Sequence, residues 1–203
     1  MRLTPKHTIW IKVVIHTGHI FAFVWLFFAV SNGYLGSDPV EPIIHFTGKA
    51  AINSLLITLL ITPLVQQFKL GALIRVRRLL GVYTFVWALL HLSSFAWLDL
   101  ALEWQLLGSE IIKRPYLIIG AIVWIILFLL TLTSTQSMQR KLGKKWQQLH
   151  NWVYIAAILA PIHYYWSVKS GIVEPIIYLM ISFILLYLRR QKIKRWLNIK
   201  MAK

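Results

Sequence analysis

Residues 141–163 read KLGKKWQQLHNWVYIAAILAPIH, and the rest of the chain is interpreted around this stretch. A basic opening leads into an apolar run that carries two histidines, His150 and His163. On one helix with a rise of about 1.5 Å per residue, the two imidazoles would stand about 20 Å apart, one in each half of a bilayer. Because imidazoles are costly in hydrocarbon unless a partner engages them, the stretch predicts a membrane helix that binds a ligand.

The composition indicates a membrane protein with several spans. Of the 203 residues, 58% are hydrophobic and only 14% are charged, whereas about 25% are charged in an ordinary soluble domain. The chain has no cysteine, which excludes disulfides, iron–sulfur clusters and thiolate-bound haem and leaves histidine as the main soft ligand. The formal charge of +16 comes from short basic loops between apolar runs, a pattern of membrane topology rather than of nucleic-acid binding.

Six apolar segments are long enough to approach or span a hydrocarbon core of about 30 Å. We predict them at residues 13–30, 43–65, 79–98, 116–134, 152–168 and 172–188. Most of the 22 Lys and Arg residues fall in the N-terminus, the second and fourth loops and the tail, whereas all six acids fall on the other side. Both termini are therefore expected in the cytoplasm, with the basic tail on anionic lipid headgroups. The expected fold is an all-α membrane protein, one transmembrane domain over residues 1–203 with six transmembrane helices and no internal repeat that changes the fold.

Depth singles out His91 and His163 among the histidines. Each lies about 17–18 Å from the cytoplasmic end of its span at a rise of about 1.5 Å per residue. Two imidazoles from separate helices at one depth can sandwich a haem, and such bis-histidine coordination closes the iron to substrates and suits electron transfer. The alternative is that each imidazole only hydrogen-bonds a neighbouring carbonyl or hydroxyl. Three histidines at depth, two of them in one segment, favour iron ligation.

His150 would lie at the cytoplasmic edge, at the level of a second haem. The same level of the third span carries Arg77 and Arg78 instead of histidine. His16, near the cytoplasmic edge of the first span, is a weak candidate for the missing ligand. A single haem, or a second haem with a non-histidine ligand, are the other options.

The spacing of His150 and His163 raises a problem of helical phase. On an ideal helix the two side chains would point about 140° apart. Pro161 lies between them and removes a backbone hydrogen bond, so we expect it to kink or rewind the helix and to bring His163 toward His91.

Basic residues at the haem levels have a second use. Haem propionates are anionic and need counter-charges in surroundings of low dielectric constant. Arg77 and Arg78 are candidates at the inner level, and Lys49 and Arg114 at the outer level. Lys49 is the strongest of these, because a lysine inside a span is hard to explain by topology alone.

The remaining histidines give weaker indications. His7 belongs to the N-terminal tail and is expected in water. His19 is one turn from His16, so a metal pair is conceivable, although two ligands make a poor metal site. His45 ends the second span on the outside, where it would form a structural hydrogen bond or contact a redox partner.

Several runs of the chain closely resemble the YedZ/MsrQ family and, more distantly, the ferric-reductase and NADPH-oxidase transmembrane domain. The runs are 45–48 (HFTG), 73–81 (LIRVRRLLG), 114–116 (RPY), 134–152 (STQSMQRKLGKKWQQLHNW) and 160–169 (APIHYYWSVK). The resemblance implies a ferric reductase-like haem-binding bundle in the bacterial inner membrane that binds haem b, one or two per chain, and FMN. It assigns haem ligation to His91, His150 and His163.

The resemblance also implies a direction for the electrons. They would pass outward to a periplasmic molybdopterin subunit that reduces methionine sulfoxide in oxidised proteins. The chain lacks the cytosolic flavin and nicotinamide domains of its distant relatives, so the donor would be membrane quinol or a separate flavin reductase. The leading hypothesis is therefore a transmembrane electron conduit without a substrate site of its own. The alternatives are a self-contained ferric or quinone reductase and a non-redox transporter with structural histidines.

Overall fold

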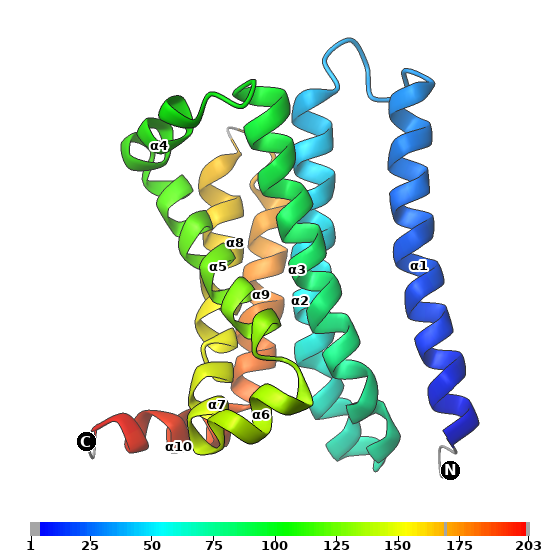
Figure 1. The fold of residues 1–203 in the computed structure, drawn as a ribbon, viewed down its shortest axis with the longest axis vertical. Helices are drawn as coiled ribbons and strands as arrows, with labels where there is room; N and C mark the ends of the chain where they lie inside the picture. Colours follow the sequence, from blue (N-terminus) through cyan, green and yellow to red (C-terminus); the bar gives the residue numbers. More distant parts are fainter. Residues whose placement is uncertain (1–4, 169, 202–203) are drawn as a thin grey trace. The chain divides into compact units, whose positions relative to one another are not determined.

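The computed structural model describes residues 5–168 and 170–201, and each regular element in those residues is a helix (Figure 1). Three residues used in the charge argument, Arg2, Lys169 and Lys203, lie outside the described residues. The chain forms two compact units, Met1–Gly108 and Ser109–Lys203.

The first unit is built on a pair of antiparallel helices with a third beside it. Its elements are α1 (Pro5–Ser31), α2 (Val40–Phe68), the 3₁₀ segment η1 (Gly71–Val76), α3 (Arg77–Ser94) and the π-helical turn η2 (Phe95–Asp99). The helices α2 and α3 pack along each other, and α1 contacts η1 and α3. Ile61, Val76 and Leu80 form a buried cluster, which Ile11 and Ile15 of α1 cover. Apolar side chains therefore hold all three helices together at this end of the unit.

The second unit repeats a helix pair and adds short helices between its members. Its elements are α5 (Pro115–Leu132), α6 (Gln136–Leu142), α7 (Lys144–His150), α8 (Val153–Ser167), α9 (Val173–Leu188) and α10 (Arg190–Met201), and α4 (Trp104–Lys113) contains the boundary with the first unit. The helix α8 contacts both α5 and α9. Ala156 and Ala157 are fully buried on α8. Their small side chains let the neighbouring helices approach closely. Pro115 occupies the first turn of α5, which confirms the predicted start of that helix.

Helix length supports part of the predicted topology. Within the described residues, four helical stretches are long and apolar enough to cross a membrane: His7–Ser31, Val40–Phe68, Gly71–Asp99 and Pro115–Leu132. The last two predicted segments form α8 and α9, which have 15 and 16 residues. At about 1.5 Å per residue these two helices fall short of a core of about 30 Å. The basic tail forms the helix α10.

The predicted single helix through both His150 and His163 is wrong. His150 is the last residue of α7, and α8 begins at Val153 after a turn at Asn151 and Trp152. Pro161 lies buried inside α8, which continues through it. The break in helical phase between the two histidines therefore lies at the turn, nine to ten residues before Pro161, where we expected it.

Candidate histidine ligand sites

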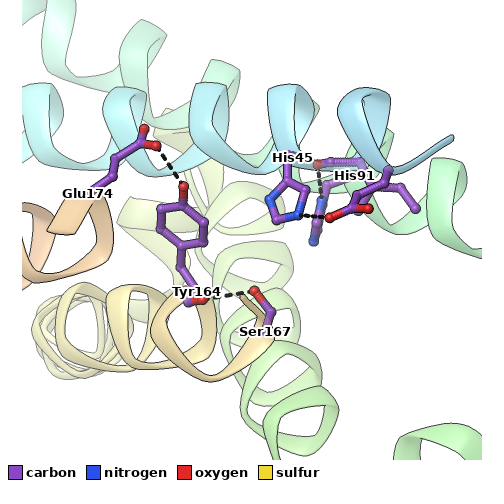
Figure 2. Close-up of polar contacts among 7 residues, drawn as sticks. His45, His91, Tyr164, Ser167 and Glu174 are labelled. Carbon is purple, nitrogen blue, oxygen red and sulfur yellow. Dashed lines mark hydrogen bonds and ion pairs between the residues drawn. The ribbon is translucent and has the colours of Figure 1, made fainter. Parts of the chain in front are cut away.

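His91 of α3 is held by the backbone of α2. Its Nδ1 lies 2.9 Å from the carbonyl oxygen of Ile44 (Figure 2). Because a carbonyl oxygen only accepts hydrogen bonds, Nδ1 carries the hydrogen and donates it. In the neutral imidazole the lone pair is then on Nε2, which is the form in which histidine binds iron.

Gly48 forms the surface on which the His91 ring lies. It is one turn after Ile44 on α2, and a Cβ placed on it would be 3.1 Å from both Cε1 and Nδ1 of His91. That separation is tighter than most carbon contacts in proteins, so even one methyl group would press on the ring. The glycine allows the imidazole to reach the α2 backbone.

His163 of α8 is held in the same way by α5. Its Nδ1 donates to the carbonyl oxygen of Tyr116 over 2.7 Å. A Cβ on Gly120 would lie 2.7 Å from Cε1 and 2.9 Å from Nδ1 of His163. Here an alanine side chain would overlap the ring. Nε2 of His163 therefore carries the lone pair too, and the sequence supplies a glycine where no larger residue fits.

These two arrangements show an internal repeat, so the expectation that no repeat matters to the fold is wrong. In both units the histidine follows its carbonyl partner by 47 residues, and the glycine is four residues after that partner. The shift along the chain that carries His91 to His163 also carries Lys69-Leu-Gly71 to Lys141-Leu-Gly143. The helix pair α2/α3 recurs as α5/α8. This shift is the signal that would have found both glycines from the sequence.

His150 is held differently, through the other ring nitrogen. Its Nε2 lies 3.1 Å from Oγ1 of Thr133, and the Thr133 hydroxyl donates to the carbonyl oxygen of Leu129 over 2.7 Å. The hydroxyl hydrogen is thereby used, so Nε2 of His150 donates in this arrangement. Trp146 stacks on the ring at 4.0 Å and donates its Nε1 hydrogen to the Thr133 carbonyl over 2.8 Å. His150 thus has the opposite tautomer from His91 and His163.

The C-terminal end of α8 is tied to the start of α9 within the second unit. Tyr164, next to His163, donates its hydroxyl hydrogen to Glu174 over 2.9 Å, and Ser167 bonds the Tyr164 carbonyl over 2.8 Å (Figure 2). These bonds restrain the last turn of α8, which carries the histidine.

The basic candidates occupy varied positions. Lys49 is half-buried and directly follows Gly48, and Arg77 is half-buried at the start of α3. Arg78 is exposed. Arg114 is exposed as well and forms an ion pair with Glu110. Their assignment to haem propionates stays a prediction.

His16 and His19 of α1, which the sequence suggested as a conceivable metal pair, form hydrogen bonds with side chains of α3. The Nδ1 of His16 lies 2.6 Å from the Tyr83 hydroxyl, and Trp87 donates its Nε1 hydrogen to Nδ1 of His19 over 2.9 Å. Among the residues that the structure describes, no group of three or more His, Asp or Glu side chains could hold a metal ion. His45 pairs with Glu41 over 3.4 Å. Sequence reasoning missed both aromatic partners, Tyr83 and Trp87.

Comparison with known proteins identifies the family. Residues 47–161 match the model of the ferric reductase like transmembrane component, a region that holds both glycines, His91 and His150 and ends two residues before His163. The chain is 53% identical over 197 residues to the protein-methionine-sulfoxide reductase heme-binding subunit MsrQ of Enterobacter sp. (strain 638), covering 97% of this chain and 99% of that protein. No solved structure matches the chain. Apolar helices of spanning length and a transmembrane family region together make this a multi-pass membrane protein, and the chain belongs to the MsrQ family, with its ferric-reductase-like transmembrane component.

Proposed function

We propose that this protein is the haem-binding electron-transfer subunit of a protein-methionine-sulfoxide reductase system. The observation that carries the proposal is the repeated cradle of carbonyl, imidazole and glycine around His91 and His163. A backbone carbonyl that accepts from Nδ1 fixes the tautomer and the ring plane of a metal-binding histidine and raises the basicity of Nε2. A purely structural histidine also needs a hydrogen-bond partner. It gives no reason for a glycine at the same position beside the ring in both units.

The residues present fit haem b. His91 and His163 are each a proposed axial ligand of haem iron, and haem would supply a reversible one-electron couple between ferric and ferrous iron. Iron that is held by histidine on both faces has no open position, so the proposed role of the chain is to pass electrons and to leave substrate chemistry to another protein. His150 is the proposed ligand of a second haem only if its ring turns away from Thr133, because its Nε2 now donates there.

The cellular setting follows from the family and the sequence. We place the chain in the bacterial inner membrane with six spans and both termini in the cytoplasm, which needs α8 and α9 to be extended by residues at their ends. Electrons enter from quinol or from a flavin reductase and leave to a periplasmic molybdopterin subunit, and FMN is the expected second cofactor. The name of the Enterobacter relative supports the haem and the partnership with a methionine sulfoxide reductase.

The test is the visible spectrum of the full chain purified from haem-replete cells. We expect the reduced protein to show the α band of a low-spin b-type haem. His91→Ala and His163→Ala should each lose that signal, because either change removes one axial ligand. His45→Gln is the matched control, since His45 is the residue after Ile44 on the same helix and is not a proposed iron ligand, and it should keep the full signal.

Two outcomes contradict the proposal. A native protein without bound haem would remove both redox hypotheses, and a full low-spin spectrum in either alanine variant would remove that histidine as a ligand. Turnover then separates a conduit from a self-contained enzyme. Reduction of methionine sulfoxide should require the periplasmic subunit, and reduction by this chain alone would refute the conduit.

A further inference from the structure

Four side chains form a polar cluster between α1 and α3 that the haem ligands do not use. His16 and His19 are one turn apart on α1, and Tyr83 and Trp87 are one turn apart on α3. The two hydrogen bonds across the gap measure 2.6 Å and 2.9 Å. The His19 ring also stacks on the Tyr83 ring with centroids 4.0 Å apart. The cluster is therefore an ordered arrangement rather than a pair of solvated histidines.

The hydrogen bonds fix what each ring nitrogen can do. An indole nitrogen only donates, so Nδ1 of His19 accepts from Trp87 and its hydrogen is on Nε2. The hydroxyl of Tyr83 can donate or accept, so His16 can carry its hydrogen on either nitrogen. The pair thus offers a fixed donor, Nε2–H of His19, beside a group that can switch between donor and acceptor.

The Nδ1 atoms of both histidines are engaged by α3, which leaves the two Nε2 atoms for a ligand. Within the described residues, the structure gives Nε2 of His16 and Nε2 of His19 no hydrogen bond. His16 is exposed, and most residues of the apolar helix that carries both histidines are exposed too. A ligand that reaches this pair along the apolar surface of α1 would be lipid-soluble. It would match the pair with an acceptor for Nε2–H of His19 and with a group that can donate or accept at His16.

The cluster is on the same face of α3 as His91. Tyr83, Trp87 and His91 follow each other at intervals of four residues, which is one stripe of a helix. At about 1.5 Å per residue, Tyr83 is about 12 Å along the axis from His91. Trp87 is 2% exposed and lies in the middle of this stripe, against Phe46 of α2 at 6.1 Å. An electron released beside Tyr83 would have a short aromatic path to the proposed ligand.

We propose that His16, His19 and Tyr83 form the site at which a membrane hydroquinone is bound and oxidised. The inference rests on the proposed function, which leaves the electron donor open, and it assigns the donor's place in the chain. A hydroquinone is small, planar and lipid-soluble, and it carries two oxygens that donate as hydroxyls and accept as carbonyls. A flavin mononucleotide carries a charged phosphate, which is costly to bring to a site along the apolar surface of α1.

The reaction balances with the groups named. One hydroxyl of the hydroquinone donates to Nε2 of His16, whose Nδ1–H then donates to the Tyr83 oxygen, and Nε2–H of His19 donates to the other oxygen. Oxidation to the quinone releases two electrons, which a bound haem would accept one at a time. It also releases two protons. The hydroxyl at His16 gives its proton to Nε2 of that residue, and the hydroxyl whose oxygen accepts from His19 gives its proton to water. His16 is the proton acceptor for the first hydroxyl, and His19 orients the ring.

The experiment measures binding and electron entry separately in the purified full chain. The variants are His16→Leu, His19→Leu and Tyr83→Phe, with His7→Gln as a matched control on the same helix. Binding of a fluorescent quinone analogue, a hydroxyquinoline N-oxide, is followed by fluorescence quenching. Reduction of the haem by duroquinol is followed by stopped-flow absorbance without oxygen, and dithionite serves as a reductant that needs no site.

We expect His16→Leu and His19→Leu to weaken analogue binding and to slow duroquinol reduction by about tenfold or more each, because each removes a hydrogen bond to the bound ligand. Tyr83→Phe should slow reduction more than it weakens binding, since its hydroxyl serves the proton on His16. All variants should keep the haem spectrum and full reduction by dithionite. His7→Gln should match the native protein in every measurement.

The outcomes separate this inference from the proposed function. If His16→Leu and His19→Leu bind the analogue and accept duroquinol electrons at the native rate while the haem is intact, the site is overturned and the haem function stands. If duroquinol does not reduce an intact native haem, the donor is of another class and the inference is again overturned. If the native protein lacks haem, the proposed function fails, and analogue binding that depends on His16 still establishes the site.

Discussion

The two units of the chain hold their histidines alike at one level and differ at the other. His91 and His163 each donate Nδ1–H to a carbonyl on the partner helix and lie on a glycine one turn further along. The shift that relates them carries His150 to Arg78. The second unit therefore has an imidazole at both positions, His150 and His163, and the first unit has only His91.

The residues that contact His150 also have no similar counterparts in the first unit. The same shift carries Thr133 to Ile61 and Trp146 to Ile74. Ile61 belongs to the buried apolar cluster of the first unit, so no hydroxyl stands where Thr133 meets His150. The comparison teaches that the contacts of His91 and His163 are the repeated part of the fold, and that the contacts of His150 occur in the second unit alone.

The two deep cradles also differ in tightness, which predicts a graded response to alanine. Gly120→Ala should have the largest effect, because its Cβ would overlap the His163 ring at 2.7 Å. The ring must leave the Tyr116 carbonyl, so we expect loss of most of the low-spin haem spectrum and a stability loss of about 2 kcal/mol. Visible spectra and thermal unfolding measure the two effects.

Gly18→Ala is the control for this substitution. Gly18 lies inside α1 with nothing within 4 Å of its added Cβ, so alanine there should keep the haem and raise stability by a few tenths to about 1 kcal/mol. A Gly120→Ala protein that behaved like Gly18→Ala would show that the cradle does not position the ring.

Gly48→Ala should fall between these two variants. Its Cβ would lie 3.1 Å from the His91 ring, a distance that the imidazole can meet by shifting a few tenths of an ångström. We expect the haem to be retained, with a changed midpoint potential because the Nδ1 bond to Ile44 is altered. Potentiometric titration measures the change. An effect of Gly48→Ala as severe as that of Gly120→Ala would mean that the two cradles are equally rigid.

The sequence predicted the all-helical fold and the histidines but not what holds them. Hydrophobic run length and loop charge are properties of local segments, so the long helices α1, α2, α3 and α5 follow from them. His91 and His163 stood out because an imidazole at depth needs a reason. The carbonyls of Ile44 and Tyr116 carry no side-chain signal, and backbone groups can only be assigned once the helices are paired.

Two features escaped for different reasons. The turn at Asn151 and Trp152 has neither glycine nor proline, so the sequence gives no sign that the helix ends there. Pro161 is the nearest helix-breaking residue, and the break was therefore predicted at that position. The role of Gly48 and Gly120 depends on a histidine 43 residues further along the chain, so neither glycine stands out by itself. Only the alignment of the two units along the sequence shows that both glycines have the same role.

Thr133→Val tests the level at which the units differ and should have the smallest effect on the haem. It makes the second unit resemble the first, where Ile61 occupies the corresponding position, and it removes the hydroxyl that Nε2 of His150 meets. If His150 is not an iron ligand, the haem content and spectrum stay native and unfolding shows a loss of about 1 kcal/mol for one buried hydrogen bond. A second low-spin haem in Thr133→Val, counted as haem per chain, would show instead that Thr133 holds His150 away from iron. The asymmetry between the units would then be a property of this one contact rather than of the missing counterpart at Arg78.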